Sequence, residues 1–225
     1  MDENKIRELC AEEGIKYIQD GFIVGLGAGR NISCLVEKIK ERGIKIKAVT
    51  PSDSTRSLCI KSGIEVLPTH LVDTIDVAFD GCGEVDSNFY ASKGGGGVHT
   101  KEKLIGRMAK DYILLVDDRK LTDKLSCRYT ICIEIIKDSL SYVEKKIKEL
   151  QGAPTVRRTN NKDGYLISDD GCLLVDIKFE EKDDFKKLNE DLEKIQGVVG
   201  TSIFIEEVTK VIVGGENGVR VLSRR

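Results

Sequence analysis

The clearest indication of the fold is the stretch FIVGLGAGRNISCLVEKIKERG, which runs from Phe22 to Gly43. Phe22–Gly25 is typical of a short β-strand and is followed by a glycine-rich turn. Apolar residues then recur at helical spacing, at Ile32, Leu35, Val36 and Ile39. Gly43 is typical of the residue that ends a helix. A strand, a tight turn and an amphipathic helix form the first half of a βαβ unit, so the stretch predicts a parallel sheet.

The same alternation continues downstream of this stretch. We expect strands at 45–50, 75–80 and 112–116, with helical segments at 54–62 and 100–110. Strands that alternate with helices of this length are typical of an open, mainly parallel sheet with helices on its faces. The first half of the chain therefore predicts an α/β fold.

The pattern changes after about residue 127. We expect a strand at 130–136, a helix at 140–150, two strands at 165–168 and 173–177, a helix at 185–195 and a strand at 202–205. The two middle strands flank Asp169-Asp170-Gly171, a hairpin signal. This βαββαβ order predicts an inserted ferredoxin-like α+β domain. We expect residues 1–127 and 207–225 to form a Rossmann-like α/β domain and residues 128–206 to form the inserted one.

The composition excludes several classes of protein. The 225 residues carry 36 Lys and Arg against 38 Asp and Glu, a net charge of -2, so we expect no nucleic-acid partner. The longest apolar runs are too short to span a membrane, and the first residues, MDENKIRELC, lack the apolar core of a secretory signal. Seven cysteines without a Cys-x-x-Cys pair predict reduced thiols rather than disulfides or a zinc site. We expect a cytoplasmic protein with no membrane partner.

The motif KGGGGVHTKEK, from Lys93 to Lys103, carries the strongest chemical signal. Four glycines let the backbone lie directly against a ligand, and ordering them is costly unless they serve a site. Thr100 is expected to cap a helix whose first turn contains Glu102. That position is expected to hold the pKa of Glu102 low, so that an ionised carboxylate is available as a general base. A glutamate is also favoured there for structural reasons alone, and His99 is expected to be structural.

Two further motifs also follow predicted strands, where ligands bind in open parallel sheets. GLGAGRN, which ends at Asn31, is typical of an anion cradle at a helix N-terminus, with Arg30 as an added donor. A tight turn without a ligand is the alternative. A dinucleotide fingerprint needs glycine at position 30 or 32, so NAD binding is disfavoured.

DGCGEVD places Asp80 at the end of a strand, where it can take part in proton transfer, whereas Asp86 is expected in a solvated turn. Mg²⁺ would need a second cluster of oxygen ligands, so we expect no metal. The run Asp117–Lys120 is expected to contribute at most one cation.

Taken in order, GLGAGRN, DGCGEVD, KGGGGVHTKEK and VDDRK resemble the motifs of the ribose-5-phosphate isomerase A family. QGAPTVRRT, SDDGCLLVDI and the closing VIVGGENGVRVL extend the resemblance over nearly the whole chain. It implies interconversion of ribose 5-phosphate and ribulose 5-phosphate, in the non-oxidative branch of the pentose phosphate pathway. It also implies that no metal or organic cofactor takes part and that the protein is a homodimer or homotetramer.

The resemblance assigns roles to individual residues. Glu102 falls on the base that moves the C2 proton to C1 through an enediolate, and Asp80 on the group that handles hydroxyl protons and ring opening. Lys93 and the glycine amides would stabilise the oxyanion. The implied substrate contacts are Ala28, Gly29, Arg30, Asn31, Gly81, Cys82, Gly83, Gly94, Gly95, Gly96 and Lys120.

The chain also departs from the family pattern. The first loop of the family usually reads G-x-G-T-G-S-T, and the three hydroxyls are replaced here by Ala28, Arg30 and Asn31. In the acidic loop, usually D-G-A-D-E, Gly83 replaces the second aspartate while Glu84 keeps its place. Losing one hydrogen bond to a charged group costs about 1.5–3 kcal/mol. Two alternatives therefore stay open: a non-catalytic phosphosugar-binding or sensor paralogue, and an isomerase for another sugar phosphate.

Overall fold

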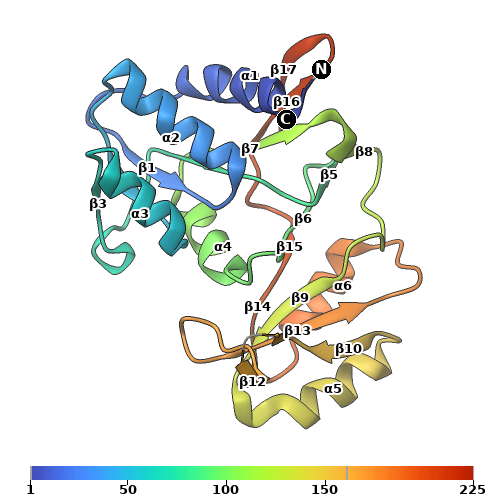
Figure 1. Cartoon of the computed structure of the whole chain (residues 1–225). Coiled ribbons are helices and arrows are strands. Elements are labelled where there is room, and N and C mark those ends of the chain that lie inside the picture. Colours follow the sequence, from blue (N-terminus) through green and yellow to red (C-terminus); the bar gives the residue numbers. More distant parts are fainter. Residues whose placement is uncertain (1, 161, 225) are drawn as a thin grey trace.

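The computed structural model describes residues 2–160 and 162–224, and it consists of an upper and a lower unit (Figure 1). The upper unit is built on a sheet with the strand order β17-β16-β7-β4-β1-β2-β3. All neighbouring strands in this sheet are parallel except the hairpin β16–β17. Its strands are β1 (Ile23–Leu26), β2 (Lys47–Val49), β3 (Glu65–Val66), β4 (Val77–Asp80), β7 (Tyr112–Asp117), β16 (Lys210–Gly215) and β17 (Gly218–Ser223).

Helices cover both faces of this sheet, because alternate residues of its central strands are buried on opposite sides. Ile113 and Leu115 of β7 pack with α1, α2 and α3, whereas Leu114 and Val116 pack on the side of α4. The helices are α1 (Glu3–Ile15), α2 (Arg30–Arg42), α3 (Asp53–Lys61) and α4 (His99–Met108). The predicted mainly parallel sheet with flanking helices is confirmed, and α2 ends at Gly43 in the left-handed conformation, with φ 67°.

The lower unit has an antiparallel sheet with the strand order β10-β13-β9-β14 and its own hydrophobic core. Its elements follow one another as β9, α5, β10, β13, α6 and β14, which is the connectivity and strand order of a ferredoxin-like unit. They are β9 (Ile131–Ile135), α5 (Leu140–Glu149), β10 (Ala153–Val156), β13 (Leu173–Lys178), α6 (Phe185–Glu193) and β14 (Val198–Thr201).

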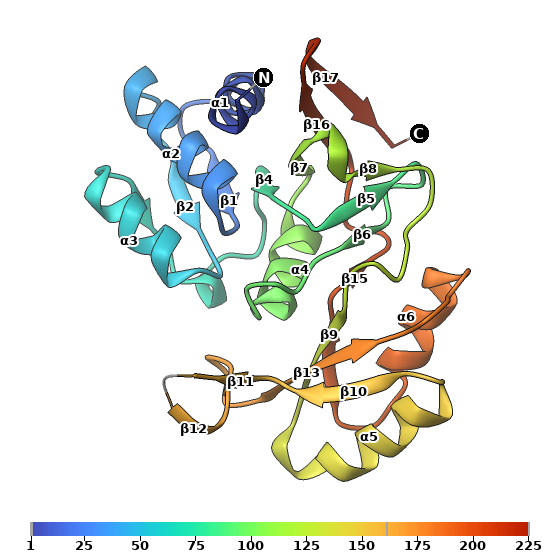
Figure 2. The same ribbon diagram turned by 45° about the vertical axis from the view of Figure 1, so that its right-hand side comes forward.

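Two strand positions in this unit differ from the prediction. The second strand is β10 rather than residues 165–168, of which Ile167 makes only an isolated bridge to Leu173. β10 contains Pro154 and is an edge strand, where proline is tolerated. The last strand is β14, because the expected 202–205 strand continues into a different sheet. A hairpin of β11 (Arg158–Thr159) and β12 (Lys162–Tyr165) projects from the unit (Figure 2).

A small third sheet lies between the two units and was not predicted. Its order is β15-β6-β5-β8, from β5 (Glu84–Asp86), β6 (Ala91–Ser92), β8 (Leu121–Thr122) and β15 (Ile203–Phe204). Asp86 was expected in solvent, but it is buried and its Oδ1 accepts the N–H groups of Asn88 and Tyr90. These short strands bring the segments after β4 and β6 close together, which is where the site lies. A 3-10 turn, η2 (Asp118–Lys120), joins β7 to β8.

Candidate active site

A cavity of about 630 Å³ opens at the carboxyl ends of β1, β4 and β7. Ligands bind at this edge of open parallel sheets. All fourteen predicted site residues line it: Ala28, Gly29, Arg30, Asn31, Asp80, Gly81, Cys82, Gly83, Lys93, Gly94, Gly95, Gly96, Glu102 and Lys120. The structure therefore brings together residues that are up to 92 positions apart in the chain, from Ala28 to Lys120.

The inner end of the cavity holds a buried cluster of one cation and two carboxyls. Lys93 Nζ lies 3.0 Å from Asp80 Oδ2 and 3.4 Å from Glu102 Oε2, and it also donates to the Gly81 carbonyl. The three side chains are only 3–8% exposed. Ion pairs withdrawn from water in this way are held in one geometry and are screened little by salt.

The position of Asp80 is fixed from several sides. It ends β4, its Oδ1 accepts the Gly81 N–H at 2.8 Å, and its Oδ2 accepts the Tyr112 hydroxyl at 2.9 Å. A Cβ on Gly27 would lie 2.1 Å from Asp80 Cγ, so only glycine fits beside it. Tyr112 was predicted only as a residue of an apolar strand. That pattern gives no sign that its hydroxyl donates to Asp80.

Glu102 does not have the low pKa that was expected from its place in the first turn of α4. Burial raises the pKa of Glu102 to about 7, the charge of Asp80 adds to this, and the charge of Lys93 opposes it. Loss of water around a carboxylate that is 8% exposed outweighs the helix dipole. A pKa near neutrality suits a group that must both take and return a proton. Despite burial, Asp80 and Glu102 hold the pKa of Lys93 above its usual value.

The beginning of α4 also differs from the prediction. The helix starts at His99 after Val98, so Thr100 lies inside the first turn instead of capping it. His99 is fully buried, its Nε2 lies 3.4 Å from the Gly200 carbonyl, and burial lowers its pKa to about 4. His99 is therefore neutral at physiological pH.

The glycine loop is shaped by its contact with the lower unit. Gly94 and Gly97 have φ values of 97° and 70°, a region that favours glycine. A Cβ on Gly94 would lie 2.8 Å from Ser202 Cβ, and one on Gly97 would lie 2.6 Å from Leu174 Cδ1. A Cβ on Gly95 would meet nothing within 4 Å. The loop is thus closely packed at its two ends, with open space at Gly95.

The outer end of the cavity is rich in cations. Arg30 begins α2, is exposed, and has no ion-pair partner among residues 2–160 and 162–224. Lys120 Nζ donates to the Cys82 carbonyl at 2.9 Å, and Asn31 Nδ2 donates to the Leu115 carbonyl at 2.6 Å. This outer end can attract an anion to the N-terminus of a helix.

Two arginines at the outer end were not predicted as site residues. Arg119 contacts Asp117 at 2.9 Å and Glu3 at 3.1 Å, and Arg7 contacts Glu3 at 2.6 Å. Arg119 belongs to a charge run that was expected to supply one cation. Arg7 lies in α1, whose sequence carries no ligand-binding motif, and only the tertiary fold brings it to the cavity.

Gly83 lies beside the ring of Tyr129. A Cβ at this position would lie 3.5 Å from Tyr129 Cγ and 3.2 Å from the Ser92 carbonyl oxygen. Glu84 accepts the Ser126 N–H at 2.8 Å and does not line the cavity, so it does not replace the missing aspartate. Tyr129 and Arg157 also line the cavity and were likewise not predicted as site residues.

Within the described residues, no group of three or more His, Cys, Asp and Glu side chains is arranged to hold a metal ion. None of the described helices combines the length and apolar character needed to cross a bilayer.

Comparison with known proteins gives a consistent result. The profile of the family "Ribose 5-phosphate isomerase A (phosphoriboisomerase A)" matches residues 47–218. Ribose-5-phosphate isomerase A of Pyrococcus abyssi is 37% identical over 229 aligned positions, with both chains fully covered. The corresponding protein of Methanocaldococcus jannaschii is 31% identical over the full length of both chains.

Solved structures agree with the sequence comparisons. The structure of ribose 5-phosphate isomerase A from M. jannaschii superimposes with a TM-score of 0.91 at 30% identity, covering 99% of this chain and all of the other. A D-ribose-5-phosphate isomerase in complex with phospho-erythronic acid gives a TM-score of 0.92 at 34% identity, with both chains fully covered. The chain described here belongs to the ribose 5-phosphate isomerase A family.

Proposed function

We propose that this protein interconverts ribose 5-phosphate and ribulose 5-phosphate, an aldose–ketose isomerisation of the pentose phosphate pathway. The observation that carries the proposal is the buried cluster in which Lys93 lies 3.0 Å from Asp80 and 3.4 Å from Glu102. Full-length relatives named ribose-5-phosphate isomerase A support it, as does the similar isomerase solved with phospho-erythronic acid, an acyclic sugar phosphate acid.

Glu102 is the proposed base. Its carboxylate removes the proton from C2 of the open-chain sugar, which leaves an enediolate, and the resulting carboxylic acid returns the proton to C1. A single group performs both steps because the two carbons are adjacent. The pKa of about 7 that burial gives Glu102 supports this, since the group then exchanges protons readily near neutral pH.

Lys93 and the glycine amides are proposed to stabilise the oxyanion. Negative charge develops on the C1 and C2 oxygens. The ammonium of Lys93 and the N–H groups of Gly94, Gly95 and Gly96 would stabilise this charge in place of water. Asp80 would move the hydroxyl protons and open the sugar ring. The Tyr112 hydroxyl and the Gly81 N–H, both directed at Asp80, support this because they hold its carboxylate in place.

The phosphate is proposed to bind at the outer end of the cavity. The N-terminus of α2, with Ala28, Gly29 and Asn31 before and within its first turn, would receive it, and Arg30 and Lys120 would add charge. Arg30 thus compensates for hydroxyls that are absent from this loop. Cys82 and Gly83 would line the path of the sugar chain.

A direct assay of ribulose 5-phosphate formation tests the proposal, using the wild type, Glu102→Gln and a panel of pentose and hexose phosphates. We expect ribose 5-phosphate to be the preferred substrate and Glu102→Gln to be nearly inactive. Tight pentose phosphate binding without turnover in the wild type would instead indicate a non-catalytic sensor. Faster turnover of another sugar phosphate would indicate a changed specificity, for which the bulk of Arg30 is the observation in favour.

We also propose the two-domain division, 1–127 with 207–225 against 128–206, a cytoplasmic location, and assembly as a homodimer or homotetramer. Separate hydrophobic cores in the upper and lower units support the division. Seven free cysteines are typical of a reducing compartment. The family resemblance alone supports the assembly, and light scattering of the purified protein measures it.

A further inference from the structure

Arg157, which follows β10 in the lower unit, is fixed on one side by an acid. Its Nε lies 2.9 Å from Asp176 Oδ2 and its second terminal nitrogen, Nη2, lies 2.5 Å from Asp176 Oδ1. A two-point pair of this kind sets the plane of the guanidinium as well as its position. The backbone of Arg157 is held too, because its N–H donates to the Leu174 carbonyl at 2.8 Å.

The other side of the same guanidinium holds the glycine loop of the upper unit. Both terminal nitrogens donate to the Gly94 carbonyl at 3.1 Å, and Nη1 also donates to the Gly95 carbonyl at 3.3 Å. These bonds join segments that are 62 and 63 positions apart in the chain. One side chain therefore fixes two consecutive peptide groups beside Lys93.

The direction of these carbonyls determines where the following N–H groups point. In a trans peptide the carbonyl and the next N–H face opposite ways, and the described peptide bonds are trans. With the Gly94 and Gly95 carbonyls on Arg157, the N–H groups of Gly95 and Gly96 point away from it. In the described part of the chain these two N–H groups have no backbone acceptor, and Gly95 borders open space.

We propose that Arg157 is a positioning residue for the isomerisation, because its guanidinium, clamped by Asp176, presents the N–H groups of Gly95 and Gly96 to the enediolate oxygens. This inference rests on the proposed function of the site. Without Arg157 the glycine loop would keep its Lys93 anchor, but the two peptide groups would be free to rotate. The donors would then have to be ordered during the reaction instead of before it.

The expected signature is a loss of turnover with little loss of substrate binding. The enediolate carries negative charge that the sugar lacks, so misplaced donors weaken the transition state more than the ground state. For Arg157→Lys we expect kcat to fall about 10- to 100-fold, part of the 10²–10³ measured for losing an oxyanion donor. KM for ribose 5-phosphate should stay within about threefold, because the proposed phosphate contacts are unchanged.

The test compares Arg157→Lys, Asp176→Asn and the control Arg158→Ala in kcat, KM and affinity for phospho-erythronic acid. Arg158 is the adjacent arginine, but it is exposed and stacks on Tyr165 with 4.7 Å between guanidinium carbon and ring centroid. Because the carboxylate of phospho-erythronic acid is negatively charged, we expect its affinity for Arg157→Lys to fall in proportion to the loss of kcat. Asp176→Asn should show a smaller loss of both, and Arg158→Ala should behave as the wild type.

Wild-type kcat in Arg157→Lys would overturn the inference, and so would a lower kcat with unchanged affinity for the acid. A purely structural role would lower the melting temperature and leave that affinity intact in the folded fraction, which circular dichroism and titration calorimetry distinguish. If the wild type itself does not convert ribose 5-phosphate, the proposed function fails. The affinity for the acid in Arg157→Lys against Arg158→Ala then still decides whether Arg157 orders the loop.

Discussion

The two ends of the cavity differ in how their charges are held. At the inner end, Asp80, Lys93 and Glu102 are 3–8% exposed, and Lys93 lies 3.0 Å from Asp80 and 3.4 Å from Glu102. At the outer end, Arg30 is exposed and, within the described residues, has no ion-pair partner. Buried charges at fixed distances can tune a proton transfer, whereas an exposed cation mainly attracts and orients an anion.

The departures in the first loop follow the same division, whereas Gly83 departs in the acidic loop that also carries Asp80. The residues at the inner end, Asp80, Lys93 and Glu102, keep the family motif, while the replaced hydroxyls at positions 28, 30 and 31 lie at the outer end. Under the proposed function, the first-loop changes fall on the phosphate end and leave the proposed proton-transfer residues intact. Changes at the two ends should therefore separate into effects on kcat and effects on KM.

The largest effect is expected from removing the central cation. Lys93→Met leaves two neighbouring buried carboxyls without their ammonium, so we expect kcat to fall about 10²–10³-fold. The acid limb of the kcat profile should also move to higher pH, because the charge of Lys93 lowers the pKa of Glu102.

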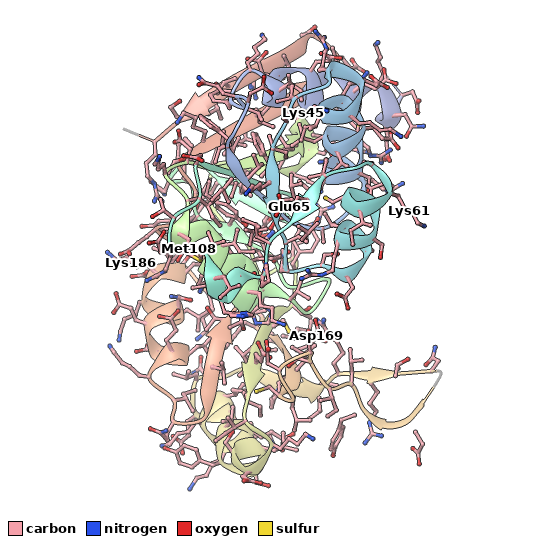
Figure 3. The ribbon with its side chains drawn as sticks, turned by 90° about the vertical axis from the view of Figure 1, so that its left-hand side faces the viewer. Lys45, Lys61, Glu65, Met108, Asp169 and Lys186 are labelled. Carbon is pink, nitrogen blue, oxygen red and sulfur yellow. The ribbon has the colours of Figure 1, made fainter. Side chains whose placement is uncertain are left out.

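Lys101→Met is the matched control for this change. Lys101 belongs to the same motif as Lys93 and lies in α4, but its side chain is 36% exposed and contacts Asp169 and Asp170 at 3.8 and 3.2 Å. Figure 3 shows Asp169 at the junction of the two units. Nearly equal kcat values in Lys93→Met and Lys101→Met would remove the distinction between a buried and an exposed lysine.

The pH dependence of the wild type should report the inner end alone. The base acts in its ionised form, so kcat should fall as the pH drops through about 7, the value to which burial raises the pKa of Glu102. Each further pH unit below it should cost about tenfold. Timed assays of ketose formation from pH 4 to 9 measure this. A midpoint near 4.5, the ordinary value for glutamate, would mean that burial does not control the base.

A smaller effect is expected at the edge of the buried cluster. Tyr112→Phe removes the hydroxyl that donates to Asp80 at 2.9 Å and leaves the ring, which stacks on Phe204, in place. Without this hydroxyl, Asp80 loses one of the donors that hold its carboxylate in place. We expect kcat to fall about tenfold.

Tyr142→Phe, on the exposed face of α5, controls for the loss of a tyrosine hydroxyl. A wild-type kcat in Tyr112→Phe would mean that this hydrogen bond does not hold the cluster in its working geometry.

The smallest effect is expected at the outer end. Arg30→Ala should raise KM for ribose 5-phosphate about three- to tenfold with little change in kcat, because an exposed charge contributes roughly 1 kcal/mol. Adding salt should reduce the difference from the wild type, since exposed charges are screened. A large fall in kcat at unchanged KM would place Arg30 in the chemistry and contradict the division between the two ends.

Much of the site followed from the sequence because its motifs are local. Gly25–Asn31 and Asp80–Gly83 lie at the ends of strands of the parallel sheet, so the alternation predicted that they meet. Lys93–Glu102 instead follows β6 of the third sheet, which was not predicted, and was recognised by its composition and by its resemblance to the family motif. Arg157 was missed because its partners lie more than sixty positions away. The expected low pKa of Glu102 was wrong, because the local sequence indicates a helix N-terminus but not how deeply the side chain is buried.

The errors in the fold have similar causes. Strand β10 contains Pro154 and is possible only because it lies at an edge, a fact of tertiary structure. The third sheet is made of strands of two or three residues, such as Ala91–Ser92, whose pairing depends on partners distant in the chain. Such short segments carry no periodic pattern of their own.

The central claim is that Glu102 carries the proton between C2 and C1, and deuterium transfer tests it most directly. In D₂O at pH 8, the wild type should form ribulose 5-phosphate with deuterium at C1, because the carboxyl of Glu102 exchanges with solvent between the two steps. Glu102→Gln should incorporate none above the uncatalysed rate while still binding phospho-erythronic acid. Incorporation by Glu102→Gln at the wild-type rate, observed by proton NMR, would contradict the account.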